Sequence, residues 1–234
     1  SPDATTEGLA DLLHEVVMRR REFPGLSGHD EWQWTQLAGG SIANHPGEVL
    51  DMVFDLIESR ELMVVGMSRG FNITDTSGQL VLALVRANPQ AAWAAYVQRV
   101  EAGSWILPMQ LRGWFAREIP PDVITEWVGS SLDRARLVAS VISVGDERPS
   151  AVAETLLDRF AGDDEIEGSL YGEFLSGAWT GPESARLTRQ IELLEGWRED
   201  ATVGPGMRAW AATVATHLIE QRRHALEREA ERGY

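Results

Sequence analysis

One acidic run has the spacing of a metal-binding motif. Asp163, Asp164 and Glu167 form a DDxxE pattern, in which the glutamate follows the aspartates by one helical turn. Carboxylates in this arrangement can hold Mg²⁺ for a diphosphate substrate. The sequence contains no second run of this kind and no basic diphosphate clamp. The one arginine cluster, Arg19-Arg20-Arg21, could contact an anion but is more typical of a helix C-terminus, where it complements the dipole. Acidic residues also favour helix N-termini, where they complement the helix dipole, and we expect that structural role here.

The five histidines form no recognisable metal motif. His217 and His224 are seven residues apart, about 10 Å along a helix, with Glu220 between them. Zinc sites on a single helix usually take histidines four residues apart, because one ion must reach both rings. We therefore predict no metal site and no cofactor. Capping or loop roles are expected for the three histidines that are isolated in the sequence: His14, His29 and His45.

The residue types also argue against covalent catalysis. The chain has no cysteine, and all 21 of its basic residues are arginine. A thiolate nucleophile, a P-loop lysine and a Schiff base are therefore excluded. The segment Gly25-Leu26-Ser27-Gly28 is one residue short of a nucleophile elbow, and Gly39-Gly40 and Gly204-Pro205-Gly206 are too sparse for a phosphate loop. A catalytic triad of Ser, His and Asp residues that are far apart in the sequence stays possible, but no motif supports one. We predict that the chain is not an enzyme.

Three of the nine tryptophans are candidates for protein contact. Trp32 and Trp34 are two residues apart, so a helix cannot bury both on one narrow face. Trp179 lies in a glycine-flanked loop, and exposed tryptophan is a favoured anchor at protein interfaces. The alternative for all three is packing inside the fold. Four others lie on apolar helical stripes and are expected in the core: Trp93, Trp114, Trp127 and Trp210.

Charge and hydropathy narrow the possible partners. The 234 residues include 36 acidic side chains and carry a net charge of −15, which argues against nucleic acid as a partner. The longest apolar run, Leu80–Val85, is far too short to span a membrane. The first residues lack both the basic and the apolar regions of a secretory signal, so we expect a cytoplasmic protein.

The first residues also lack an initiator methionine, which fits a fragment of a longer chain. Abundant Arg, Ala and Gly without Lys are typical of a GC-rich bacterial genome.

Apolar residues recur at helical spacing through nearly the whole chain. Leu50, Val53, Phe54 and Ile57 are one example. Strict alternation over the length of a strand is scarce. We predict helices over the following segments: Thr5–Arg21, Asp30–Ala43, Pro46–Ser59, Glu61–Arg69, Ser77–Ala87, Pro89–Glu101, Trp105–Glu118, Pro121–Ser130, Ser131–Val144, Pro149–Ala161, Asp163–Ser176, Pro182–Glu199 and Pro205–Arg232.

The prolines indicate how these helices are arranged. Proline is tolerated at the first position of a helix because its missing N–H would have no partner there. Six prolines begin or precede amphipathic segments at intervals of 23 to 43 residues: Pro46, Pro89, Pro121, Pro149, Pro182 and Pro205. Each interval is close to the length of two helices with their turns. We predict an all-α fold, a single domain over residues 1–234 built as a right-handed α-solenoid-like stack of antiparallel helix pairs. Beyond Leu218 the last helix is expected to be solvated.

Paired helices at this spacing resemble HEAT and armadillo repeats. The C-terminal third adds a second likeness. There, residues 174–184 lead into Ile191–Trp197, Met207–Ala211 and a charged helix that ends the chain. This order, over about 60 residues, is similar to the C-terminal helical ends of large bacterial proteins that carry an effector or NTPase domain upstream, some of them linked with phage defence. The irregular spacing departs from the HEAT pattern and leaves the repeat family open. The resemblance implies a recognition or scaffold role without catalytic residues.

Two classes of function follow from these features. The first is a non-catalytic helical module that binds a protein partner, since stacked helices offer a long concave surface and an acidic surface suits a basic partner. The second is an all-helical enzyme or a small-ligand regulator with a pocket that the sequence does not reveal. Alkylpurine DNA glycosylases are one helical-repeat family of about this length, but the net charge opposes DNA binding. The sequence indicates no oligomeric state.

Overall fold

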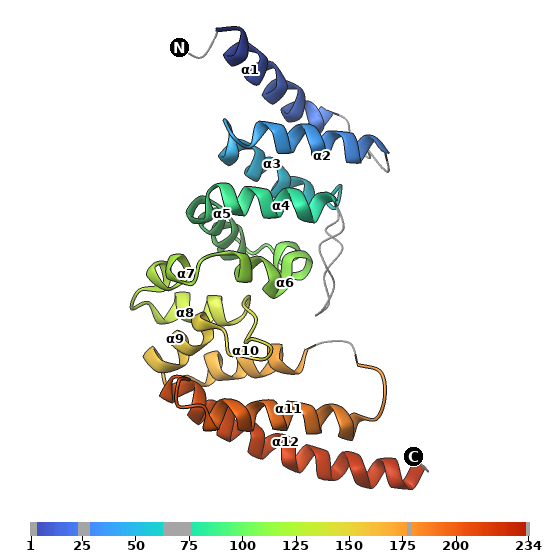
Figure 1. Cartoon of the computed structure of the whole chain (residues 1–234), viewed down its shortest axis with the longest axis vertical. Helices are drawn as coiled ribbons and strands as arrows, with labels where there is room; N and C mark the ends of the chain where they lie inside the picture. Colours follow the sequence, from blue (N-terminus) through green and yellow to red (C-terminus); the bar gives the residue numbers. More distant parts are fainter. Residues whose placement is uncertain (1–3, 23–28, 63–75, 177–178, 233–234) are drawn as a thin grey trace. The chain divides into compact units, whose positions relative to one another are not determined.

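The computed structural model describes residues 4–22, 29–62, 76–176 and 179–232 (Figure 1). These residues form helices and no strand, apart from an isolated bridge between Gly145 and Pro149. The predicted all-α class is therefore confirmed. Among the described helices, none combines the length and apolar character that crossing a bilayer requires. The chain forms two compact units, residues 1–123 and 124–234; the single domain and the solenoid-like stack stay predictions.

The described residues of the first unit form six helices and a short 3₁₀ turn, and a seventh helix begins at its end. They are α1 (Ala4–Met18), η1 (Arg19–Glu22), α2 (His29–Ser41), α3 (Pro46–Glu58), α4 (Thr76–Ala87), α5 (Pro89–Glu101), α6 (Ile106–Glu118) and α7 (Pro121–Val128). The second unit contains the end of α7 and α8 (Leu132–Ala139), α9 (Ala151–Arg159), α10 (Asp164–Leu175), α11 (Glu183–Glu199) and α12 (Pro205–Arg232).

Local signals at the helix ends account for the close match with the predicted segments. Helix α5 has the predicted bounds, and the side chain of Asn88 accepts a hydrogen bond from the backbone N–H of Ala91 at 3.0 Å. This bond satisfies one of the free N–H groups of the first turn. The predicted helix at Glu61–Arg69 lies largely outside the described residues, and its first two residues, Glu61 and Leu62, are not helical.

Helix α3 is the central element of the first unit. It contacts α1, α2, α4, α5 and α6, and seven of its 13 residues are buried. Phe54 of α3 meets Phe115 of α6, with ring centroids 6.0 Å apart, and Tyr96 of α5 lies 4.7 Å from Phe115. Edge-on and tilted contacts between aromatic rings add to the burial of apolar surface. These rings form a core shared by α3, α5 and α6.

An arginine ties α5 to the polar side of α3. A terminal nitrogen of Arg99 donates to the carboxylate of Asp55 at 2.8 Å and to the backbone oxygen of Asp51 at 3.0 Å. The Glu58 carboxylate lies 3.9 Å from the Arg99 Nε atom. The guanidinium also lies 5.6 Å from the ring centroid of Phe54. One cation therefore neutralises several carboxylates that would otherwise repel one another along α3.

In the second unit, α8 is shorter than the predicted segment Ser131–Val144. It ends at Ala139, and the hydroxyl of Ser140 donates to the backbone oxygen of Leu137 at 2.7 Å. Val141, Ile142 and Val144 are buried all the same. The spacing of these buried apolar residues resembles that of the buried face of a helix, although the segment is not helical. The predicted helix therefore continued beyond Ala139.

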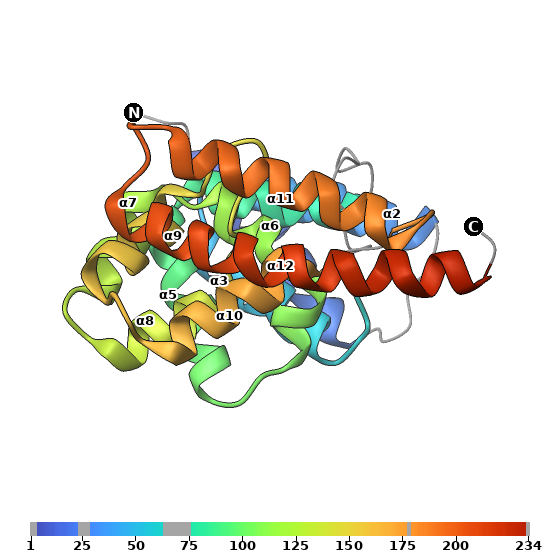
Figure 2. The ribbon, with the colours of Figure 1, turned by 90° about the horizontal axis from the view of Figure 1, so that it is seen from below.

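Helices α11 and α12 lie side by side as an antiparallel hairpin (Figures 1 and 2). At its open end the carboxylate of Glu229 accepts hydrogen bonds from the N–H and the hydroxyl of Ser184, at 3.0 and 2.6 Å. Arg228 pairs with Glu183 at 2.9 Å, and Ala225 is buried. The expectation of a solvated helix beyond Leu218 was therefore wrong for one face of α12.

The start of α12 is held against α9 by two carboxylates. Glu154 accepts a hydrogen bond from the N–H of Gly204 at 3.0 Å, and Asp158 accepts one from the N–H of Gly206 at 2.6 Å. The free N–H groups at a helix N-terminus favour anions. A side chain at Gly204 would collide with the Asp158 carboxylate, and one at Gly206 with the backbone of Leu157.

Candidate functional site

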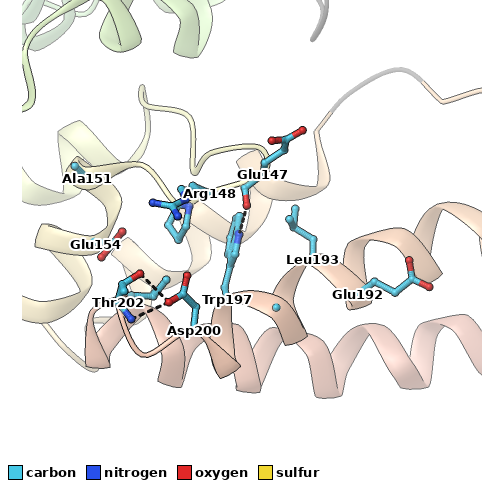
Figure 3. A pocket seen from close by; sticks show the side chains of 12 residues that line it. Glu147, Arg148, Ala151, Glu154, Glu192, Leu193, Trp197, Asp200 and Thr202 are labelled. Carbon is cyan, nitrogen blue, oxygen red and sulfur yellow. Dashed lines mark hydrogen bonds between the residues drawn. The ribbon is translucent and has the colours of Figure 1, made fainter.

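A groove with an acidic rim lies in the second unit (Figure 3). Its volume is about 440 Å³, within the range of ligand pockets. Three parts of the chain line it: the loop before α9, the first turns of α9, and the last turns of α11 with the turn that follows. We call it the acidic groove, after its four carboxylates: Glu147, Glu154, Glu192 and Asp200.

A tight loop places one wall of the acidic groove. The N–H of Ser150 donates to the backbone oxygen of Val144 at 2.7 Å, which closes the loop. Gly145 has a φ of 126°, and a side chain there would collide with the backbone of Arg148. Glycine is the residue that adopts this conformation without strain. The indole N–H of Trp197 donates to the backbone oxygen of Glu147 at 3.1 Å and so fixes the loop against α11 (Figure 3).

The four carboxylates differ in the hydrogen bonds that they accept from other described residues. Glu154 accepts the Gly204 N–H. Asp200 accepts hydrogen bonds from the hydroxyl and the N–H of Thr202, at 2.7 and 2.8 Å, and these bonds lower the pKa of its carboxyl below the ordinary value. Glu147 and Glu192 make no side-chain hydrogen bond or ion pair with any described residue. Two exposed acceptors thus line the groove near the half-buried side chain of Leu193, while Trp197 is buried.

The chemistry of the groove suits binding. Carboxylates flanking an apolar strip can accept hydrogen bonds from a cationic group whose stem packs on the strip. One cation of the chain, Arg148, also lines the groove, so the net charge of the lining is negative. The lining contains no histidine, and the hydroxyl of Thr202 donates to Asp200.

The three tryptophans proposed as contact residues have different surroundings. Trp32 is 48% exposed and stacks on His29, whereas Trp34 is 6% exposed and its indole N–H donates to the backbone oxygen of Val17 at 3.2 Å. Packing, the alternative interpretation, therefore applies to Trp34. The prediction that one helix could not bury both rings is confirmed.

Trp179 is 37% exposed, and two contacts hold its ring in place. Its indole N–H donates to the backbone oxygen of Pro182 at 3.2 Å, and the guanidinium of Arg189 lies 5.1 Å from the ring centroid. Trp105, which the sequence analysis did not single out, is 59% exposed and lies 5.3 Å from the guanidinium of Arg60. Its position at the end of a loop, one residue before α6, was the available signal. Of the tryptophans expected in the core, Trp93 and Trp210 are buried, while Trp114 and Trp127 are half-buried.

The acidic run has the structural role that was expected. Asp163 is the N-cap of α10 and accepts the N–H of Ile166 at 3.0 Å. Arg136 of α8 donates two hydrogen bonds to the same carboxylate, at 3.2 and 2.7 Å. These bonds, the Arg136 pair first, hold the pKa of Asp163 below its ordinary value. The carboxylate of Glu167 accepts a hydrogen bond from the backbone N–H of Gly162.

The histidines and the arginine cluster are placed as follows. Among the described residues, no metal-ligating group forms around His217 and His224, and His224 pairs with Glu227 at 3.4 Å. His14 and His45, 31 residues apart in the sequence, stack on each other. Arg20 is buried in the turn after α1 and donates to Glu61 at 3.2 Å. The near-elbow at residues 25–28 lies outside the described residues.

Comparison with protein-family models, curated proteins and solved structures finds no match to this chain.

Proposed function

We propose that the chain is a non-catalytic helical module of HEAT- or armadillo-like helix pairs that binds a protein partner. The partner contributes a basic segment to the acidic groove. The observation that carries the proposal is the pair of exposed carboxylates, Glu147 and Glu192, which have no side-chain partner among the described residues and line the groove together with the half-buried Leu193. An Arg or Lys side chain fits this arrangement, because its stem packs on Leu193 while its charged head reaches the carboxylates.

The charge of the whole chain supports the same class of partner. A net charge of −15 attracts basic surfaces over distances of about 10 Å at 0.1 M salt. Packing between successive helices within each unit, such as α4 with α5 and α11 with α12, supports the helix-pair architecture. The ordered, partly exposed ring of Trp179, at the start of the same hairpin, offers an apolar anchor outside the groove.

Titration of the full chain with a fluorescent Arg-rich peptide tests the proposal. We expect binding that weakens with NaCl and weakens about three- to tenfold in the double variant Glu147→Gln/Glu192→Gln, since exposed ion pairs contribute about 0.2–1 kcal/mol each. The matched control is Glu126→Gln, an exposed glutamate of α7 outside the groove. Equal affinity for an acidic peptide of the same length, or an equal loss in the control, would contradict the proposal.

A second candidate is a small cationic ligand, which the volume of about 440 Å³ favours. Competition separates the two. Free arginine or spermidine that displaces the peptide at concentrations near that of the peptide itself would favour a small ligand. Displacement only at far higher concentrations would favour a protein segment with further contacts, such as Trp179.

A further inference from the structure

Two histidines and two carboxylates meet where α1 packs on the start of α3. Asp11 and His14 are three residues apart on α1, and His45 and Glu48 are three residues apart at the start of α3. Residues at this spacing lie on one face of a helix. One ligand atom each of His14, His45 and Glu48 lies within 4.8 Å of the other two. Asp11 joins them, with its carboxylate 3.8 Å from the Nε2 atom of His45.

From this cluster we propose a zinc-binding site. His14 and His45 supply nitrogen ligands, and Glu48 supplies an oxygen ligand. The carboxylate of Asp11 is the candidate for the fourth ligand. Zinc takes histidine and carboxylate ligands in tetrahedral sites, whereas Mg²⁺ and Ca²⁺ take oxygen ligands. Two nitrogens and two oxygens therefore suit zinc. The ion would join α1 to α3 within the first unit.

His14 is already oriented as a metal ligand. Its Nδ1 atom lies 3.2 Å from the hydroxyl of Ser41, a residue that is buried, and its Nε2 atom lies 2.9 Å from Glu48. Without an ion, a proton on Nε2 makes the contact with Glu48 a hydrogen bond; with zinc in its place, Nδ1 carries the proton and donates it to Ser41, and the lone pair of Nε2 faces the ion. Ligand histidines commonly have their second nitrogen fixed by a hydrogen bond of this kind. Ser41 is thus a positioning residue for the site.

His45 is the ligand that moves. The two imidazole rings stack with centroids 3.9 Å apart and planes 19° apart, so their nitrogen lone pairs lie in two separate, nearly parallel planes. A single ion can take both nitrogens only if one ring turns. His45 occupies the N-cap position of α3 without making a cap hydrogen bond, and its nearest carboxylates lie 3.8 and 3.9 Å away. We expect zinc to turn this ring out of the stack.

Zinc titration of the full chain, freed of metal with EDTA and carrying no histidine tag, tests the site. Calorimetry is expected to show one zinc ion per chain, and Co²⁺ in its place is expected to give the visible absorption bands of a tetrahedral complex. Glu48→Gln and His14→Ala are expected to weaken zinc binding at least about tenfold, and Ser41→Ala about tenfold. Glu48 is 64% exposed, so its substitution leaves the fold intact and keeps the test decisive.

Two matched controls use histidines outside the cluster. His29→Ala and His224→Ala each remove one imidazole, and both are expected to leave zinc affinity unchanged. The proposal is overturned if zinc does not bind stoichiometrically, because the cluster is then only a set of hydrogen bonds and ion pairs. It is equally overturned if His224→Ala abolishes binding while Glu48→Gln does not.

Discussion

At the scale of single residues, Asp163 shows how one carboxylate can serve two helices. It caps α10 through the N–H of Ile166 and receives two hydrogen bonds from Arg136 of α8. Both contacts favour the ionised form, so the pKa of the carboxyl is lower in the folded chain than in the unfolded one. Folding is therefore coupled to the ionisation of this side chain.

This coupling predicts a pH dependence with a definite sign. Because the folded-state pKa is depressed, the stabilisation by Asp163 is complete above the ordinary pKa of 3.8 and is lost as the pH falls through the folded-state value. Asp163→Asn keeps a residue that caps helices well but removes the charge. We expect this variant to have a lower Tm at neutral pH and a smaller fall in Tm below about pH 4.

Thermal unfolding by circular dichroism at several pH values measures this effect. The matched control is Asp164→Asn, which removes the adjacent carboxylate; that carboxylate makes no ion pair with any described residue. The control is expected to follow the parent chain at acidic pH. Parallel acid profiles for Asp163→Asn and the parent would refute the role assigned to Asp163.

At the scale of elements, the link between α3 and α5 depends on Arg99. Its guanidinium contacts Asp51 and Asp55 and lies over Phe54. Arg99→Met keeps an apolar stem of similar length but removes the hydrogen bonds and ion pairs that Arg99 makes to Asp51 and Asp55. We expect the free energy of unfolding to fall by about 1–3 kcal/mol, the usual cost of losing hydrogen bonds to a charged group.

Urea unfolding of the full chain measures this loss. Arg86→Met is the control, because Arg86 is exposed on α4 and reaches its nearest carboxylate, Glu118, only at 3.9 Å. Its loss is expected to change stability by less than about 0.5 kcal/mol. A similar loss in both variants would mean that the α3–α5 link contributes no more than an ordinary surface pair.

Elements were the level at which the sequence was most informative. Proline at the start of α5 marked a boundary by local chemistry alone, and the structure adds a cap at Asn88. The segment after Ala139 was misjudged because buried residues such as Val141 and Ile142 lie at a spacing that suits a helix and a buried turn alike. Local patterns thus predicted the helices but not every place where a helix stops.

The candidate sites could not be read from the sequence in the same way. The acidic groove takes Glu147 from a loop, Glu154 from α9 and Glu192 from α11. His14 and His45 belong to different helices, and no short motif links them. Only tertiary packing brings such residues together, so a search by spacing treats each as isolated.

At the scale of the whole molecule, negative charge is shared by both units. Residues 1–123 contain nine arginines and 16 acidic residues, and residues 124–234 contain 12 and 20. Each unit therefore carries excess charge that opposes its own compact state. The Arg99–Asp55 and Arg136–Asp163 pairs are short, at 2.8 and 2.7 Å, and partly shielded from solvent, so salt weakens them less than it weakens this general repulsion.

We therefore expect NaCl to stabilise the chain at neutral pH. Raising its concentration from about 0.02 M to about 0.5 M reduces the screening length severalfold, and the Tm is expected to rise. Near pH 4.7, the pI calculated from the sequence, the net charge vanishes and the same increase in salt is expected to have little effect. A fall in Tm with salt at neutral pH would show that local ion pairs outweigh the net repulsion.

The contact between α9 and the start of α12 has an evolutionary consequence. Gly204 and the Asp158 side chain are packed directly against each other. A β-carbon at position 204 would meet the Asp158 carboxylate. In a homologue that keeps this junction, a side chain at position 204 requires the residue at position 158 to turn aside or to be shorter. The two positions are therefore expected to covary, and an alignment would reveal this contact without any structure.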